Sequence, residues 1–174
     1  IDGLRVELPP MSIYSNLIAS RIFSRLESYA TERRLGSAVI EALIILDVER
    51  DLRRRPDVAF VSAERWPLEH ALPEEGDWQI VPDLAVEVTS PNDLLAEVLA
   101  KVDEYFHYGV RQVWLVVSPE RQVYVYDSPT KVRILSESDK LSGGELIPGF
   151  ELPLAALFRR QPACEMPNQP VDPM

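Results

Sequence analysis

The chain has few of the residues that form disulfide bonds and compact metal sites. Among its 174 residues are one cysteine, Cys164, and two histidines, His70 and His107. Cys164 therefore has no second thiol for an internal disulfide, and the chain lacks the ligands of a structural zinc site. A lone cysteine is typical of reducing compartments, so we expect a cytoplasmic protein.

Long apolar segments are missing as well. The apolar run at residues 42–46 is far too short to cross a bilayer. The chain does not open on a basic stretch followed by an apolar one, so nothing predicts secretion, and its start at Ile1 rather than methionine indicates a trimmed beginning. We therefore expect no membrane association.

Positive charge is scarce. Acidic residues outnumber lysine plus arginine by 28 to 18, which gives a net charge of −10 and a pI near 4.7. Because nucleic-acid backbones are bound by basic side chains that displace counterions, this balance argues against a strong general affinity for nucleic acid. Arginines do cluster at Arg53, Arg54 and Arg55, and the cluster is either a local basic patch or a solvated loop.

Several catalytic motifs are also absent. The chain has no glycine-rich phosphate loop, no GxGxxG dinucleotide motif and no GxSxG nucleophile elbow, and its two scattered histidines do not indicate a catalytic triad. Hydrolysis through a side-chain nucleophile is therefore poorly supported. If the chain is an enzyme, its carboxylates must carry the reaction.

Hydrophobic periodicity predicts helices that alternate with strands. Residues 10–31 repeat apolar side chains at helical spacing before a stop at Gly36, and a second helix should run from the cap candidate Ser90 to about Tyr108, before Gly109. The predicted strands are rich in branched and apolar residues and cover residues 39–48, 57–61, 84–89, 113–117, 123–126 and 131–135.

This order of elements predicts an α+β (mixed α/β) fold in which helices flank one central mixed sheet. We expect a single domain over residues 1–160. Residues 161–174 hold four prolines and no apolar period, which predicts a disordered proline-rich tail.

Two acids stand out by their positions. Asp57 begins a predicted strand directly after Pro56, as a turn residue also could, and Glu87 lies in the middle of an otherwise apolar strand. Because side chains alternate along a strand, Asp83 and Glu87 share one face with small residues between them, which leaves room for a cation. A buried ionised carboxylate needs a partner, so Glu87 is either a metal ligand or half of a buried ion pair with an arginine.

Lys101 has two interpretations. It lies at the margin of the apolar stripe of the second predicted helix, and Glu97 precedes it by four residues. Position alone favours a surface lysine paired with Glu97, an interaction worth about 0.3 kcal/mol. The other interpretation is a catalytic lysine beside the two acids.

Two stretches resemble a known family. Residues 54–61 (RRPDVAFV) and 82–93 (PDLAVEVTSPND) are similar to motifs of the bacterial Uma family of putative restriction endonucleases, which is assigned to the PD-(D/E)XK nuclease superfamily. The similarity continues through Lys101, Tyr105 and residues 109–117 and 146–150. It implies a restriction endonuclease-like core of helix, three strands, helix and strand.

The resemblance also implies roles for single residues. Asp57 matches the motif aspartate and Glu87 the second acid, so both would bind Mg²⁺. The superfamily usually places a lysine two residues after the second acid, where this chain has Thr89. In the family the lysine has moved to the following helix, which maps to Lys101. The superfamily often adds an acid on the first helix, for which Glu27 is the candidate.

The activity implied is Mg²⁺-dependent hydrolysis of phosphodiester bonds, with DNA the expected substrate. Arg53, Arg54 and Arg55 would contact the nucleic-acid backbone. Nucleases of this kind often act as dimers, so the resemblance also implies a homodimer. The alternative is a non-catalytic nucleic-acid-binding or assembly module that retains the fold. The acidic balance favours this module, whereas the carboxylate pair favours the nuclease. A structural protein with no nucleic-acid role is a third possibility.

Overall fold

The computed structural model describes residues 12–90 and 93–159. In chain order its elements are α1 (Ile13–Glu32), β1 (Gly36–Ile40), β2 (Ile44–Asp47), β3 (Leu52–Arg54), β4 (Val58–Ser62), β5 (Leu84–Thr89), α2 (Leu95–His107), β6 (Gln112–Val117), β7 (Gln122–Ser128), β8 (Lys131–Leu135), β9 (Lys140–Ser142), β10 (Glu151–Pro153) and α3 (Leu154–Leu157). The tail predicted at residues 161–174 lies outside the described residues and stays a prediction.

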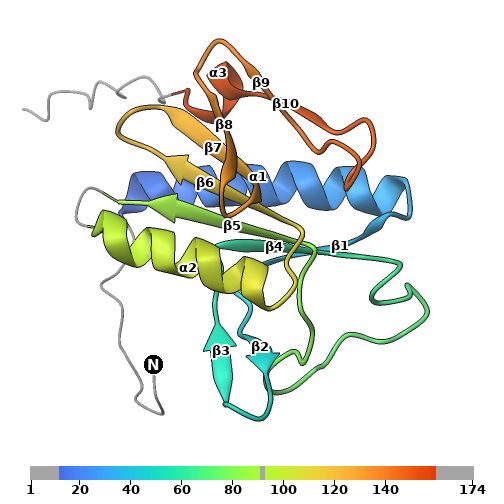
Figure 1. The fold of residues 1–174 in the computed structure, drawn as a ribbon. Coiled ribbons are helices and arrows are strands. Elements are labelled where there is room, and N and C mark those ends of the chain that lie inside the picture. Colours follow the sequence, from blue (N-terminus) through green and yellow to red (C-terminus); the bar gives the residue numbers. More distant parts are fainter. Residues whose placement is uncertain (1–11, 91–92, 160–174) are drawn as a thin grey trace, which may run out of the picture.

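Six strands form one central sheet (Figure 1). Its order is β1-β4-β5-β6-β7-β8, in which β5 and β6 run parallel and all other neighbours run antiparallel. A parallel pair needs a crossover connection, which here contains α2. The two-stranded sheets β2-β3 and β9-β10 lie at opposite ends of the molecule. The architecture is the predicted α+β (mixed α/β) fold with a central mixed sheet.

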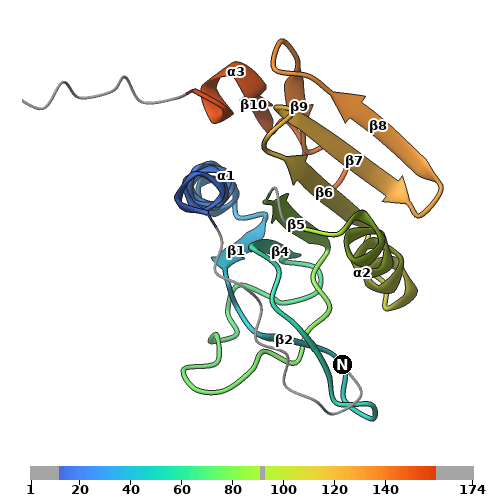
Figure 2. The same cartoon turned by 90° about the vertical axis from the view of Figure 1, so that its left-hand side faces the viewer.

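Helices cover both faces of this sheet, with α1 on one side and α2 on the other (Figure 2). The alternation of side chains along β5 explains the arrangement. Leu84, Val86 and Val88 belong to the core cluster that includes the apolar residues of α1, whereas Ala85 belongs to the cluster that includes those of α2. Glu87, two residues after Ala85, therefore faces α2. No helix in the described ranges has the length and apolar character that crossing a bilayer requires.

The end of α1 differs from the prediction. The helix begins after its N-cap Ser12, whose side chain accepts a hydrogen bond from Ser15 N at 3.1 Å, and it ends at Glu32 rather than at Gly36. Gly36 instead opens β1, where an added Cβ would lie 2.1 Å from Val61 O. Glycine is therefore needed there for the close approach of two strands, not for ending a helix.

The single strand predicted over residues 39–48 is two strands in different sheets. β1 ends at Ile40, and Glu41 turns the chain with a positive φ of 49° before β2 begins. Branched residues on both sides of this turn give one continuous strand-like pattern, which explains the error. The short strands β3 (LRR) and β9 (KLS) carry no alternating apolar pattern that would predict them.

The start of α2 also differs, whereas its end agrees. The N-cap is Leu94, without a side-chain cap, rather than Ser90. Ser90 instead donates its main-chain N–H to Asp93 Oδ2 at 2.7 Å. The helix ends at His107, and Gly109 has a φ of +94°, the left-handed conformation that glycine adopts beyond a helix end.

Candidate active site

Strands β4 and β5 bring Asp57 and Glu87 together. The strands are antiparallel with Val58 opposite Val86, so the same register, continued by one residue, sets Asp57 opposite Glu87. Opposed residues of antiparallel strands have Cα atoms about 4.5–5.5 Å apart. Asp57 Oδ2 accepts a hydrogen bond from Val88 N at 2.5 Å, which fixes its carboxylate beside the end of β5. The two acids are therefore neighbours.

Helix α2 supplies two donors to Glu87. Lys101 Nζ lies 3.1 Å from Glu87 Oε2, and Tyr105 donates its hydroxyl to Glu87 Oε1 at 2.6 Å. Lys101 and Tyr105 are four residues apart, so they share one face of the helix. Lys101 thus pairs with Glu87 and not with Glu97, and the cationic partner of Glu87 is a lysine and not an arginine.

Thr89 occupies the position where the superfamily usually has its lysine. Its hydroxyl donates to Val116 O on β6 at 3.3 Å, so the side chain links two neighbouring strands of the sheet. The ammonium group of Lys101 reaches Glu87 from α2 instead. The structure brings Asp57, Glu87 and Lys101 into one cluster, and their catalytic roles remain a prediction.

The two carboxylates lie where solvation is poor. Burial, and next the negative charge of Glu87, raises the pKa of Asp57 to about 7, although the Val88 N–H and Lys101 lower it in part. Glu41 contributes a smaller increase to the pKa of Asp57. Burial, and then Glu87, raises the pKa of Tyr105 well above its ordinary value. Tyr105 therefore remains a hydroxyl donor, whereas Asp57 changes its charge near neutral pH.

The donor set of this cluster suits a hard divalent cation. Asp57 and Glu87 offer carboxylate oxygens, and one ammonium group does not balance two carboxylates. Within residues 12–90 and 93–159, no group of three or more Asp, Glu, His or Cys side chains is arranged to cage a metal ion. Mg²⁺ is commonly held by one or two carboxylates with water and substrate phosphate as its other ligands, so the residues present fit a partly hydrated ion.

The predicted nucleic-acid-binding arginines are largely engaged by acids. Arg53 forms ion pairs with two aspartates, and Arg54 donates two hydrogen bonds to Glu104 on α2. Arg55 is exposed, and in the described part of the chain it forms no ion pair. The cluster is thus less basic than its sequence suggests, and Arg54 ties β3 to the helix that carries Lys101.

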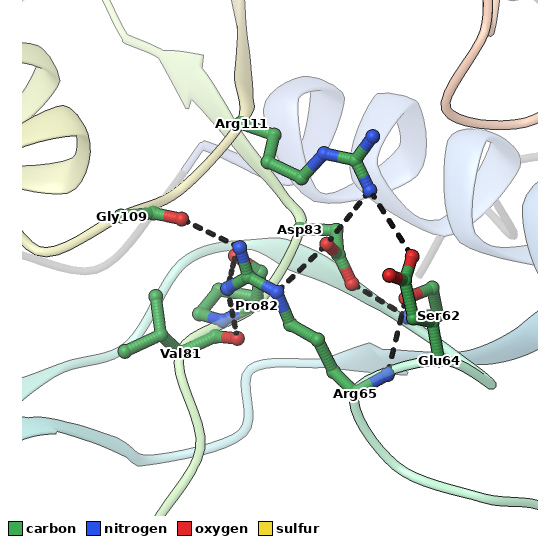
Figure 3. A network of polar contacts seen from close by, with 8 residues as sticks. All are labelled: Ser62, Glu64, Arg65, Val81, Pro82, Asp83, Gly109 and Arg111. Carbon is green, nitrogen blue, oxygen red and sulfur yellow. Dashed lines mark hydrogen bonds and ion pairs between the residues drawn. The ribbon is translucent and has the colours of Figure 1, made fainter.

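Asp83 does not join Glu87, which corrects the expectation of a cation site between them. It lies before β5 begins, four residues and roughly 13 Å of strand from Glu87. Its fully buried carboxylate accepts a hydrogen bond from Ser62 N at 2.8 Å and pairs with Arg65 at 2.8 Å and Arg111 at 3.5 Å (Figure 3). Two arginines already neutralise this carboxylate, so Asp83 is a structural residue.

Tyr105 and Glu41 also lie close to the acid pair, and Glu27 is the acid expected from the first helix. Tyr105 is signalled by its place four residues after Lys101 in an apolar stripe, because a buried tyrosine hydroxyl needs a partner. Glu41 has no signal in the sequence, since its position near Asp57 depends on the turn after β1. Glu27 accepts a hydrogen bond from Ala38 N at 2.8 Å, so it ties α1 to β1.

Comparisons with known proteins identify the family of this chain and a protein with a similar fold. The sequence model of the Uma2 family, described as putative restriction endonuclease, matches residues 1–155. A crystal structure from Anabaena variabilis, described as a putative nuclease belonging to DUF820, is similar with a TM-score of 0.78 and 21% identity, covering 91% of this chain and 87% of that chain. No curated protein matches the chain. Because the family match spans most of its sequence, the chain belongs to the Uma2 family.

Proposed function

We propose that this protein is a Mg²⁺-dependent endonuclease that hydrolyses phosphodiester bonds of DNA. One observation carries the proposal: the carboxylates of Asp57 and Glu87 lie side by side in a poorly solvated place, with the ammonium group of Lys101 on Glu87. Membership of a family described as putative restriction endonuclease supports the reaction class. The similar fold of a protein described as a putative nuclease is consistent with it.

Each residue of the cluster has a distinct role in this proposal. Asp57 and Glu87 would hold Mg²⁺, with the main-chain carbonyl of Val88 as a further oxygen ligand. Bound Mg²⁺ lowers the pKa of a coordinated water and offsets negative charge on the phosphate. Lys101 orients the attacking water or donates to a phosphate oxygen, which stabilises the charge that develops in the transition state.

Contact with the nucleic-acid backbone falls mainly to Arg55. Its side chain is exposed, whereas Arg53 and Arg54 would have to exchange carboxylate partners for phosphates. With a net charge of −10, the protein should bind DNA weakly and lose affinity steeply as salt increases. The three arginines remain the proposed nucleic-acid-binding residues, with Arg55 expected to contribute most.

Nicking of a supercoiled plasmid tests the activity. Glu87→Gln keeps the size of the side chain and removes its charge, so we expect cleavage with Mg²⁺ to fall at least about a hundredfold. Glu97→Gln, on the exposed face of the same helix, is the matched control and should cleave like the unmodified protein. Undiminished cleavage by Glu87→Gln refutes the role of Glu87, and a single-stranded RNA substrate in parallel distinguishes DNA from RNA.

A non-catalytic nucleic-acid-binding or assembly module is the second candidate. The observation that favours it is that both carboxylate oxygens of Glu87 and one of Asp57 already accept hydrogen bonds within the protein. Such a module would shift DNA in a gel without cleaving it in Mg²⁺, and Glu87→Gln would leave the shift unchanged. A cytoplasmic homodimer is proposed for either candidate, and analytical ultracentrifugation measures the oligomeric state.

A further inference from the structure

The carboxylate of Glu87 receives a separate donor on each oxygen. Tyr105 donates to Oε1 at 2.6 Å, and Lys101 donates to Oε2 at 3.1 Å. The two donors lie one helical turn apart on α2. One donor is a neutral hydroxyl and the other a charged ammonium group, so the two oxygens of Glu87 are not equivalent.

The donors differ in how easily they can leave. Tyr105 is 1% exposed, and its ring belongs to the core cluster formed by α2 and the sheet, so its hydroxyl cannot move without repacking that core. The side chain of Lys101 is 32% exposed and ends a flexible four-carbon chain. Oε1 therefore keeps its partner, while Oε2 has one that can move to solvent or substrate.

We propose that Tyr105 is a positioning residue that presents Glu87 Oε2 to the divalent cation, and that Lys101 and the cation compete for this oxygen. The inference rests on the proposed function, because it concerns the same metal site. With a cation on Oε2, Tyr105 would hold the orientation of Glu87, and the ammonium group of Lys101 would be free to contact a substrate phosphate. The carboxylate of Glu87 would thus couple cation binding to the position of the Lys101 ammonium group.

The proposal predicts effects of opposite sign for the two donors. Tyr105→Phe keeps the ring and removes the hydroxyl, so Glu87 can rotate and the affinity for Mg²⁺ falls about tenfold, as is usual when the hydrogen-bond partner of a metal ligand is removed. Lys101→Met keeps an unbranched side chain of similar size and removes a competing and repelling charge, so the affinity for Mg²⁺ rises about tenfold. A purely structural role for both residues would weaken binding in both variants.

The test is isothermal titration of the full chain with MgCl₂ in the absence of nucleic acid, at about pH 8 so that carboxyl groups are ionised. Tyr14→Phe is the matched control, because its hydroxyl donates to Phe158 O at 2.9 Å on the other side of the sheet. Chemical denaturation of each variant without Mg²⁺ measures any general loss of stability. We expect the Mg²⁺ affinity of Tyr14→Phe to equal that of the unmodified protein even if its unfolding free energy falls.

Each result has a distinct meaning. Tyr105→Phe with the same Mg²⁺ affinity as Tyr14→Phe overturns the positioning role, and Lys101→Met with unchanged or weaker affinity overturns the competition. Either result leaves the proposed function standing if the unmodified protein binds Mg²⁺ and Glu87→Gln does not. If the unmodified protein and Glu87→Gln titrate alike, the metal site itself is refuted, and this inference with it.

Discussion

Strand β5 has a buried acid near each end, and the two acids differ in the charges that surround them. Asp83, just before the strand, is fully buried and contacts two arginines and the N–H of Ser62. Glu87, near the other end, has one lysine and one neutral hydroxyl as partners and lies next to Asp57. One carboxylate thus faces two positive charges, whereas two carboxylates share a single positive charge.

The comparison separates a structural acid from a candidate functional one. A buried carboxylate that is fully hydrogen-bonded and neutralised fixes its surroundings and has no capacity for another ligand. Arg65 also donates to Val81 O at 2.8 Å and Gly109 O at 2.7 Å, so the Asp83 end joins the loop before β5 to the turn after α2. The Glu87 end keeps excess negative charge, which a divalent cation would relieve.

The largest effect on stability is expected at the Asp83 end. Asp83→Asn removes the negative charge from a fully buried site, so two arginines lose their shared carboxylate partner. The unfolding free energy should therefore fall by about 3 kcal/mol. Urea denaturation followed by circular dichroism measures it. The partial exposure of both arginines keeps the expected loss at the lower end for a broken buried pair.

Glu87→Gln is the matched comparison for that experiment. The glutamine oxygen can still accept one hydrogen bond, and its amide can donate to Asp57, which relieves the repulsion between the acids. We therefore expect its loss of unfolding free energy to be less than half that of Asp83→Asn. Equal losses at both ends would contradict the distinction between a neutralised acid and an acid pair with excess charge.

The ionisation of Asp57 should make the stability of the protein depend on pH. Burial and Glu87 raise the pKa of Asp57 from an ordinary value of 3.8 to about 7, so the folded protein binds a proton that the unfolded chain has already released. Unfolding free energy should therefore fall as pH rises from about 4 to about 7, and change little above that range. Asp57→Asn should remove most of this slope in urea titrations at successive pH values.

Cleavage should respond to pH in the opposite direction. Mg²⁺ binding requires ionised carboxylates, so plasmid nicking should increase towards neutral pH as Asp57 loses its proton and then reach a plateau. A cleavage rate that falls over the range in which Asp57 ionises would argue against Asp57 as a ligand. Higher Mg²⁺ concentration should move the rise to lower pH, because the cation favours the ionised acid.

Much of the central sheet can be predicted from local sequence. The bounds of β5 and β8 agree with the prediction, because short apolar or branched runs between turns carry a strong local signal. The division between β1 and β2 cannot be predicted in this way. Glu41 turns the chain with a positive φ while its N–H donates to Asp57 O at 3.1 Å, a contact that exists only in the folded protein.

The residues of the candidate site likewise divide into those that the sequence identifies and those that depend on tertiary contacts. Glu87 is conspicuous in the sequence because an acid interrupts an apolar strand, and Lys101 is identified by the family resemblance. The sequence does not predict that Asp83 is neutralised by arginines, because Arg111, one of its partners, is 28 residues away in sequence. Alternation along a strand places acids on a face, but the charges that surround each acid are set by tertiary contacts.

The smallest predicted effect compares the two arginines of the Asp83 end. Arg65 lies 2.8 Å from Asp83, is 28% exposed and donates to main-chain carbonyls, whereas Arg111 lies 3.5 Å away and is 49% exposed. Replacing Arg65 by methionine should cost about 1.5 kcal/mol of unfolding free energy, and replacing Arg111 about 0.5 kcal/mol, since exposed ion pairs contribute little. Urea denaturation of both variants and of the double variant measures the difference. If Arg111→Met costs as much as Arg65→Met, charge alone and not hydrogen bonding holds this end of β5, and the contrast with the Glu87 end must be drawn from net charge only.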